Sequence, residues 1–255
     1  MTSPLKVWVE RDGRLLRLRL NRPKANIIDA EMIAALDAAL AQHADNTGLT
    51  AILLDAEGPH FSFGASVEEH LPEQCAAMLK ALHALIRRMV ECPAPILVAI
   101  NGQCLGGGLE VAAAGHLLFA APEASLGQPE IKIGVFAPAA SCLLPERIGQ
   151  ARAEDLLYSG RSISGTQGAA IGLVNEAVAD PEAAALAWFD AHLADKSASS
   201  LRQAVKAARA GFAERVSAKL ETVERLYTDE LMASRDALEG LTAFIDKRPA
   251  KWEHR

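Results

Sequence analysis

The chain has 255 residues, of which 50% are hydrophobic and 23% are charged, with a formal net charge of −6. This length is enough to bury a sizeable core in one large domain, alone or with a helical extension. The acidic balance argues against nucleic acid or an anionic membrane as the main partner. Four widely spaced cysteines without a CxxC pair, and an N-terminus unlike a signal peptide, predict a protein with free thiols in the cytoplasm.

The chain opens with a predicted strand and a predicted helix. Leu16–Leu20 alternates leucine with arginine, which is the period of a half-buried strand. Asp29 can cap the helix that follows, with Ile28 and Ile33 placed as a hydrophobic staple across its first turn. The apolar spacing predicts that this helix ends near residue 43.

Buried strands and helices then alternate. Short apolar runs at 51–55, 96–100 and 117–121 are typical of buried strands. Between the first two, apolar residues at helical spacing predict a long helix from near Pro72, and prolines from Pro93 onward end it. Alternating strands and helices indicate the α/β class.

From about Pro181 the composition changes to alanine-rich helical segments with basic outer faces. We therefore predict a core that carries the active site in residues 1–180 and a helical region in residues 181–255.

Gly106, Gly107 and Gly108 lie between the strand at 96–100 and a small-residue helix at 109–114. Three consecutive glycines are costly to order, because glycine loses the most conformational freedom on folding. They are explained if the backbone must approach a ligand at a helix N-terminus, or if strand and helix cross tightly. The GxxxxGK[ST] and GxGxxG patterns are absent, which disfavours a phosphate-binding loop.

Two glutamates stand in apolar surroundings near these glycines. Glu110 follows them directly, and Glu130 ends the segment Gly-Gln-Pro-Glu twenty residues later. A carboxylate is expensive to bury, although Glu110 could simply favour the helix dipole. If the two carboxylates meet, they cannot both ionise normally, so one could act as an acid and the other as a base.

Five segments together resemble the enoyl-CoA hydratase/isomerase (crotonase) family: NRPKANIIDAEM, FSFGAS, NGQCLGGGLEVAAAG, GQPEIKIGV and EGLTAFIDKR. They occur in the family order and span nearly the whole chain. The resemblance implies an α/β fold in which repeated ββα units wind as a spiral. It also implies a helical C-terminal part that assembles a trimer or a dimer of trimers (a hexamer).

The same resemblance implies the site residues. Glu110 and Glu130 match the glutamates that add or remove water, and the backbone N–H groups of Ala65 and Gly107 match the oxyanion hole. Retention of both glutamates favours hydration over isomerisation. The implied CoA contacts are Lys24, Ala25, Phe244 and Lys247, of which the last two are often donated by a neighbouring subunit. CoA is part of the acyl-CoA substrate, and no metal, cofactor, nucleic acid or membrane is expected.

Two longer stretches, FSFGASVEEH and GQPEIKIGVFAPAAS, more closely resemble the cyclohexa-1,5-diene-1-carbonyl-CoA hydratases of anaerobic aromatic degradation. Those lyases form 6-hydroxycyclohex-1-ene-1-carbonyl-CoA. Ser66 stands where the family usually has an aspartate, and Phe63 where a small residue is common. We predict that Phe61, Phe63 and Phe136 wall a ring-shaped acyl group. Neutral variation in loop packing, and a general short-chain enoyl-CoA hydratase of fatty-acid β-oxidation, are the alternatives.

Other site chemistry receives less support from the sequence. Cys104 could be a nucleophile, but no histidine is near it in the chain. His60 and His70 flank the FSFGAS loop and could touch a substrate. The histidines show no HExxH spacing, so a metal site is not predicted. An RNA-binding or inactive crotonase-like protein is the alternative from another class, and the acidic charge and both glutamates disfavour it.

Overall fold

The computed structural model describes residues 3–255, and its main sheet has the strand order β1-β2-β3-β4-β6-β9. Within this sheet the β1–β2 pair is antiparallel and the other pairs are parallel. These strands are β1 (Leu5–Glu10), β2 (Leu15–Leu20), β3 (Ala51–Ala56), β4 (Ile96–Ile100), β6 (Leu117–Ala120) and β9 (Glu176–Ala177). A small second sheet has the order β5-β7-β8, with β5 (Gln103–Leu105), β7 (Ser125–Gly127) and β8 (Ser162–Ser164).

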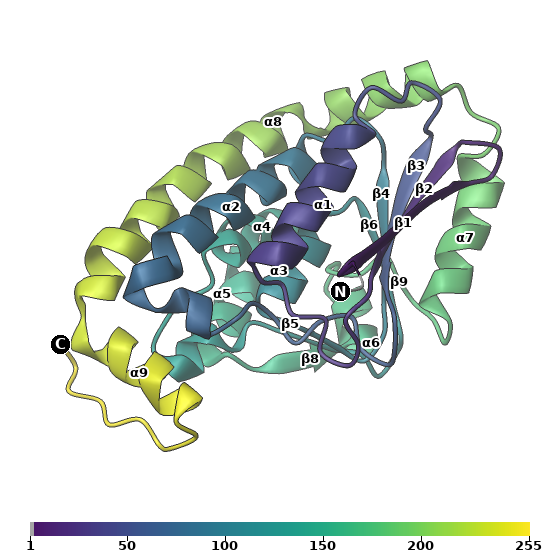
Figure 1. The fold of residues 1–255 in the computed structure, drawn as a ribbon. Coiled ribbons are helices and arrows are strands. Elements are labelled where there is room, and N and C mark those ends of the chain that lie inside the picture. Colours follow the sequence, from purple (N-terminus) through teal and green to yellow (C-terminus); the bar gives the residue numbers. More distant parts are fainter. Residues whose placement is uncertain (1–2) are drawn as a thin grey trace.

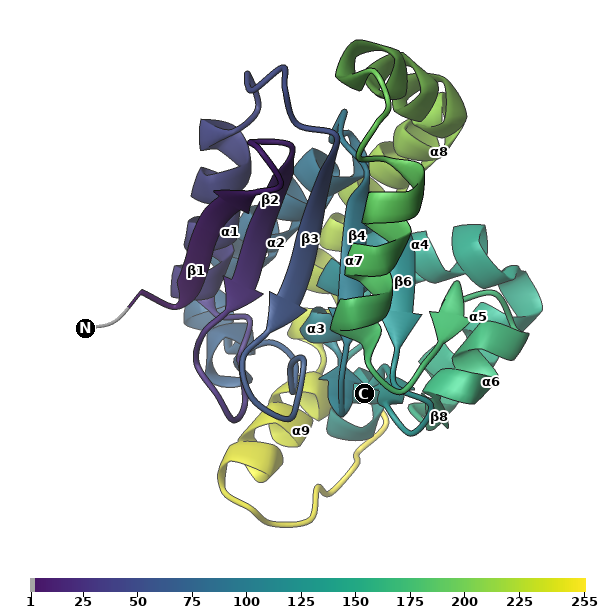
Figure 2. The ribbon, with the colours of Figure 1, turned by 90° about the vertical axis from the view of Figure 1, so that its right-hand side faces the viewer.

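Helices cover both faces of the main sheet (Figures 1 and 2). One face packs on α1 (Ala30–Gln42), α2 (Pro72–Val90) and α3 (Gly107–Ala114), and the other packs on α7 (Pro181–His192). Strand β3 shows why its apolar run is continuous: Ile52 and Leu54 belong to the first core, and Ala51 and Leu53 to the second. The sheet is therefore buried on both sides, as parallel sheets usually are.

The remaining helices surround this sandwich. They are η1 (Glu68–His70), η2 (Pro129–Ile133), α4 (Pro138–Ile148), α5 (Gln150–Ser159), α6 (Gly165–Ala170), α8 (Ala198–Arg225), a π-helix η3 (Leu226–Glu230), η4 (Leu231–Ala233) and α9 (Arg235–Ile245). Helix α8 packs along α2 and α4, and α9 packs on η2. No helix within residues 3–255 is long and apolar enough to cross a membrane.

Several predicted elements are confirmed. Helix α1 begins after Asp29, whose side chain accepts a hydrogen bond from the N–H of Met32 at 3.0 Å. The staple residues Ile28 and Ile33 are both buried. Helix α2 begins at Pro72 and ends before the prolines. The strand β5 was not predicted, because three residues are too few to show a period.

The strand predicted at Leu16–Leu20 is confirmed as β2, but the prediction that it is half-buried is wrong. Arg17 is only 3% exposed, because α7 covers the arginine side of the strand. The sequence pattern could not show this cover, since α7 begins more than 150 residues later.

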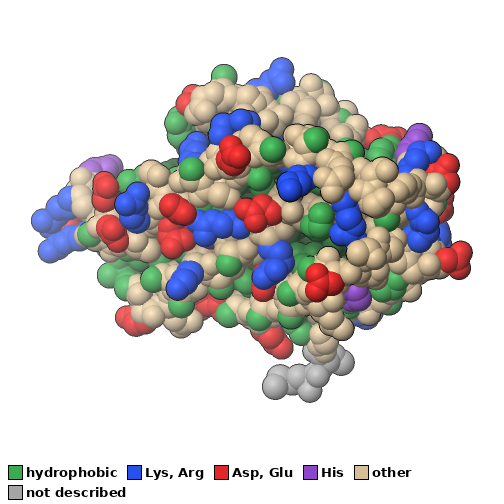
Figure 3. Space-filling view, turned by 90° about the horizontal axis from the view of Figure 1, so that it is seen from above, with side chains coloured by type: hydrophobic (Ala, Val, Ile, Leu, Met, Phe, Trp, Pro, Cys, Tyr) green, Lys and Arg blue, Asp and Glu red, His purple; other side chains and the backbone are tan. Residues whose placement is uncertain are grey.

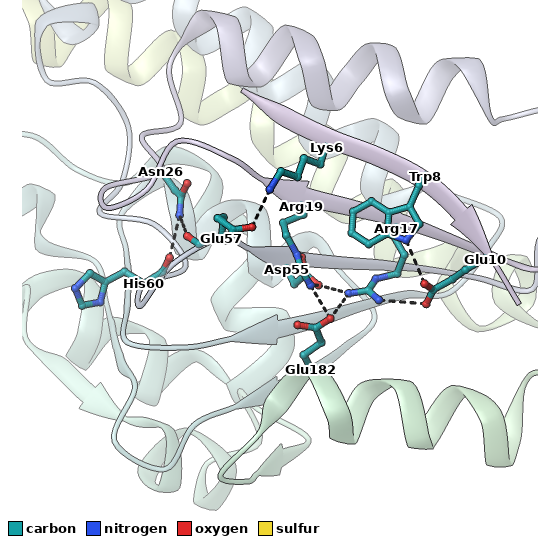
Figure 4. Close-up of polar contacts among 10 residues, drawn as sticks. All are labelled: Lys6, Trp8, Glu10, Arg17, Arg19, Asn26, Asp55, Glu57, His60 and Glu182. Carbon is teal, nitrogen blue, oxygen red and sulfur yellow. Dashed lines mark hydrogen bonds and ion pairs between the residues drawn. The ribbon is translucent and has the colours of Figure 1, made fainter. Parts of the chain in front are cut away.

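A buried ion cluster joins β2, β3 and α7 on this side of the sheet (Figure 4). Arg19 binds both oxygens of Asp55 at 2.6 and 2.8 Å, and Arg17 also contacts this carboxylate. Both arginines reach Glu182 of α7 at 2.5 Å. The Arg17 guanidinium carbon lies 4.9 Å from the ring centroid of Trp8, a favourable cation–π distance.

Asp55→Ala should lower the free energy of unfolding by about 3–5 kcal/mol, because it leaves two guanidinium groups facing a buried site without their shared carboxylate. Urea denaturation at neutral pH measures the loss. Asp190→Ala is the matched control: it removes the exposed pair with Arg11 and should cost less than about 1 kcal/mol. Equal losses in the two variants would contradict a dominant role for the buried cluster.

Candidate active site

A cavity of about 320 Å³ lies where α2, α3, η2 and α9 meet. Its walls are mainly apolar, formed in part by Val67, Leu79, Leu82, Ile133, Val135 and Pro138. Ala65, Gly107, Glu110 and Glu130 also line this cavity, so the structure brings together all four residues expected at the reacting centre. A larger hollow of about 440 Å³ lies between α1, α2 and α8, on the far side of α2, and includes none of the four. The volume of a cavity alone therefore does not identify the candidate active site.

The backbone of the FSFGAS loop packs so closely against the start of α3 that there is little room for a side chain at Gly107 or Gly108. A Cβ atom added to Gly107 would lie 3.0 Å from the Cβ of Ala65 and 3.1 Å from its nitrogen. A Cβ added to Gly108 would lie 2.6 Å from the Cβ of Ser62. Both explanations of the three glycines are therefore consistent with the structure: the loop and the helix pack tightly, and their contact borders a cavity.

Two backbone N–H groups at this contact, those of Ala65 and Gly107, have no hydrogen-bond acceptor among the described residues. Gly107 is the first residue of α3, where helical N–H groups lack an intrahelical partner. Within residues 3–255, neither the N–H of Gly107 nor that of Ala65 donates to a protein acceptor. Both residues line the cavity, so these donors are placed to bind an oxygen atom of a ligand.

Glu110 is held in the first turn of α3. Its side chain is 3% exposed, and its Oε1 accepts a hydrogen bond from the N–H of Ala140 at 2.8 Å. Burial raises the pKa of Glu110 to about 7, although the N–H groups of Ala140 and Ala139 favour the charged form.

Glu130 reaches the same cavity from η2. A Cβ added to Gly106 would lie 2.5 Å from its Oε1, so the carboxylate sits directly against the glycine run. Burial, and then the charge of Glu110, raise the pKa of Glu130 to about 8. With its amide nitrogen turned toward Glu130, the buried Gln128 donates to both carboxylate oxygens at 3.2 and 3.1 Å.

The two glutamates should make the protein less stable as the pH rises. Both have a higher pKa when folded than the ordinary value of 4.5, so the folded state keeps protons that the unfolded chain releases. The stability this supplies is complete below about pH 4.5 and is lost as the pH rises through 7 and 8.

Glu110→Gln keeps an acceptor for Ala140 but cannot ionise. At pH 8 it should raise the free energy of unfolding by about 1 kcal/mol or more, since one pKa unit corresponds to about 1.4 kcal/mol. Urea denaturation at pH 5 and pH 8 measures this gain, which should be small at pH 5. The exposed Glu123→Gln is the control and should follow the wild type. If the free energy of unfolding of Glu110→Gln equals that of the wild type and of Glu123→Gln at pH 5 and at pH 8, the raised pKa of Glu110 is contradicted.

The three phenylalanines predicted to wall a ring differ in position. Phe63 lines the cavity and is 44% exposed. Phe61 is fully buried in the core, and Phe136 packs edge-on against Tyr227 at 5.1 Å between ring centroids. Neither is among the residues that line the cavity, so contact of these two with a ring-shaped acyl group stays a prediction. Phe61 belongs to the buried core, and loops lack the regular period that would show which of their side chains are buried.

Of the predicted CoA residues, one lines the cavity and the others do not. Phe244 of α9 lines the cavity of its own chain, and Lys247 follows that helix. Lys24 is exposed, and the carbonyl of Ala25 accepts a hydrogen bond from Phe63 at 2.9 Å. Ser66 is not among the residues that line the cavity, and its hydroxyl donates to Glu68 at 3.1 Å.

His70 lines the cavity, whereas the sequence left open whether it touches a substrate. Its Nδ1 lies 2.6 Å from the carbonyl oxygen of Ser66, so this nitrogen carries the proton of a neutral ring. Burial lowers the pKa of His70 and favours that neutral form. Gln128 and Lys132 are further polar groups at the site that sequence reasoning missed, although both lie in segments that matched the family. Within residues 3–255, no cluster of three or more His, Cys, Asp or Glu side chains could hold a metal ion.

Comparison with known proteins agrees with this geometry. Residues 10–255 match the family model described as enoyl-CoA hydratase/isomerase. The chain is 68% identical over 254 residues to the cyclohexa-1,5-dienecarbonyl-CoA hydratase of Thauera aromatica, covering 100% of this chain and 98% of that protein. It is 32% identical to a probable enoyl-CoA hydratase of Bacillus subtilis (strain 168), covering 92% and 94%.

A crystal structure of an enoyl-CoA hydratase/isomerase from Pseudoalteromonas atlantica T6c superposes with a TM-score of 0.84 at 30% identity, covering 98% of this chain and 99% of the other. The crotonase fold inferred from the sequence is thereby confirmed. The chain belongs to the enoyl-CoA hydratase/isomerase family.

Proposed function

We propose that the protein hydrates cyclohexa-1,5-diene-1-carbonyl-CoA to 6-hydroxycyclohex-1-ene-1-carbonyl-CoA, as a step of anaerobic aromatic degradation. The observation that carries this proposal is the 68% identity, end to end, to a hydratase named for that substrate. The cavity supports it, because two raised-pKa carboxylates and two free N–H groups share one apolar space.

In the proposed mechanism, the N–H groups of Ala65 and Gly107 bind the thioester oxygen. Attack on the unsaturated thioester pushes negative charge onto this oxygen. Each preorganised donor that meets this charge is typically worth about 3 kcal/mol in the transition state. The donors need no rearrangement, because the close contact of loop and helix already fixes them.

Glu110 and Glu130 share the acid and base roles. Their raised pKa values allow one to be protonated and the other ionised near neutral pH. The ionised carboxylate takes a proton from water, whose oxygen bonds to the ring carbon β to the carbonyl. The electron pair of that double bond moves to the thioester oxygen.

The resulting enolate is conjugated with the second double bond of the ring. As it collapses, the protonated carboxyl gives its proton to the far end of the diene, and one double bond remains between the two new bonds. The net change is 1,4-addition of water. The two glutamates end with their protonation states exchanged, and the proton returns between them before the next cycle.

The other predicted contacts complete the proposal. Lys24, Ala25, Phe244 and Lys247 would hold the CoA portion. Phe61, Phe63 and Phe136 would wall the acyl group, and Ser66 would lie near the mouth of the cavity. No cofactor is needed, because CoA is part of the substrate and backbone donors stabilise the charge. We further propose a cytoplasmic enzyme that assembles as a trimer or a dimer of trimers.

A general short-chain enoyl-CoA hydratase of β-oxidation is the second candidate, favoured by the 32% identity to a probable enoyl-CoA hydratase. An RNA-binding role receives no such support. On the face seen in Figure 3, Lys and Arg side chains are interspersed with Asp and Glu, whereas nucleic-acid binding gathers basic side chains on one face.

Glu110→Gln and Glu130→Gln should each lower kcat for hydration by about 10²-fold or more, the usual size of a general acid–base contribution. Binding of a saturated CoA thioester should change little, because the amide keeps the size of the side chain. Steady-state kinetics and calorimetric titration measure both effects, with Glu123→Gln as the control. A variant that kept more than about a tenth of the activity, with chemistry rate-limiting, would remove that glutamate from the mechanism.

The enzyme should prefer the cyclic dienoyl-CoA over crotonyl-CoA by about 100-fold or more in kcat/KM. This corresponds to about 2.7 kcal/mol, which shape and apolar contact can supply. A rigid ring also has little rotational freedom to lose in an apolar cavity. Parallel assays of both thioesters decide the matter: comparable values would reject the specialised function, and a preference for crotonyl-CoA would establish the second candidate.

A further inference from the structure

Asn26 is a fully buried residue whose side-chain amide joins its own loop to a second loop near the cavity. Its Nδ2 donates to the carbonyl oxygens of Glu57 and His60, each at 3.0 Å (Figure 4). Its Oδ1 accepts from the N–H of Arg22 at 2.9 Å, and its own N–H returns a bond of the same length to the Arg22 carbonyl. The side chain therefore uses both donors of its amide on one loop and its oxygen on the other.

The segment that carries Asn26 also holds the next part of the same loop. The carbonyl of Ala25 accepts from the N–H of Phe63, and the N–H of Ile28 donates to the carbonyl of Gly64, both at 2.9 Å. Residues 22–28 thus bind residues 57–64 at four backbone positions. The next residue is Ala65, whose N–H faces the cavity without a protein acceptor within residues 3–255.

The residue type at this position is restricted. Asn26 has a φ of +45°, in the left-handed region where asparagine is better tolerated than most residues. Two carbonyl oxygens converge on its Nδ2, so the group there must be a double donor. An aspartate would place a carboxylate oxygen against both carbonyls, and leave them buried without donors.

We propose that Asn26 is a positioning residue for the oxyanion hole, acting through the loop 57–64 on the N–H of Ala65. It fixes the start of the loop, and Ala25 and Ile28 fix its middle, so that the Ala65 N–H stays beside Gly107. The inference rests on the proposed role of Ala65. Asn26 touches neither the substrate nor the glutamates. It acts on the position of the Ala65 N–H, and so on the stabilisation of the negative charge that develops on the thioester oxygen.

The test compares a ground-state ligand with one that carries the charge. Cyclohexane-1-carbonyl-CoA reports ordinary binding. The enolate of 2-oxocyclohexane-1-carbonyl-CoA places negative charge on the thioester oxygen, and its ultraviolet absorbance reports binding in that form. Asn26→Asp should lower kcat and enolate affinity together by about 10- to 100-fold, since complete loss of one such donor costs about 10²–10³-fold in kcat. Affinity for the saturated thioester should change less than about threefold.

Asn21→Asp is the matched control. This substitution makes the same change of charge a few residues away. The Nδ2 of Asn21 donates to the carbonyl oxygen of Ser3 at 3.1 Å and not to the loop 57–64. It should leave all three measurements near those of the wild type. If Asn26→Asp does not fold, Asn26→Gly keeps the backbone conformation without the repulsion and should show the same pattern at smaller size.

The outcomes separate this inference from the proposed function. A wild type that neither hydrates the dienoyl-CoA nor binds the enolate would overturn the proposed function. If the wild type does both, an Asn26 variant that keeps kcat and enolate affinity within threefold overturns the positioning role. Equal loss of affinity for both ligands would also overturn it, since that pattern indicates general damage to the cavity.

Discussion

The contact between the loop at Ala65 and the start of α3 is the constraint on which the rest of the site depends. Added Cβ atoms at Gly107 and Gly108 would lie 3.0 Å or less from the side chains of Ala65 and Ser62. The helix can therefore begin only where glycines let the loop lie against it. This placement brings the backbone of Ala65 and Gly107 to one cavity, which Glu110 also lines from the first turn of the helix.

The same burial that brings these groups together makes the two carboxylates reactive near neutral pH. An isolated, exposed glutamate is almost fully ionised at pH 7, and therefore a poor acid. In this cavity, loss of solvent and mutual repulsion raise both pKa values. At Glu110, the hydrogen bond from the N–H of Ala140 opposes that rise without cancelling it. Burying two carboxylates that ionise lowers the free energy of unfolding. The apolar core on both faces of the sheet offsets this loss.

Sequence reasoning succeeded where a local pattern has one physical cause. The Asp29 cap, the long helix from Pro72 and the glycine run all depend on neighbours a few residues away, and all lie as expected. It failed where a distant segment decides the environment. Arg17 looked exposed because α7, which covers it, is remote in the chain.

The aromatic residues show a different limit of the sequence. Phe61 and Phe63 alternate as if they lay on a strand, and one of them does face the core. Nothing in the sequence shows which of the two faces the cavity, because the direction is set by pairing of the loop with residues 25 and 28. Asn26 was overlooked similarly: only the folded chain shows two carbonyls converging on its amide.

The position of Glu130 depends finally on the C-terminal helix. A Cβ added to Gly240 of α9 would lie 2.2 Å from the carbonyl oxygen of Ile133, and one added to Gly134 would lie 2.7 Å from that of Asp236. Helix α9 thus packs directly on η2, the turn that carries Glu130. The same helix places Phe244 in the cavity wall. Family resemblance suggests a neighbouring subunit as the usual source of this residue, but here the chain supplies it to its own cavity. Phe244 is 55% exposed in the single chain, so much of this residue is open to contact by a ligand or by a second chain.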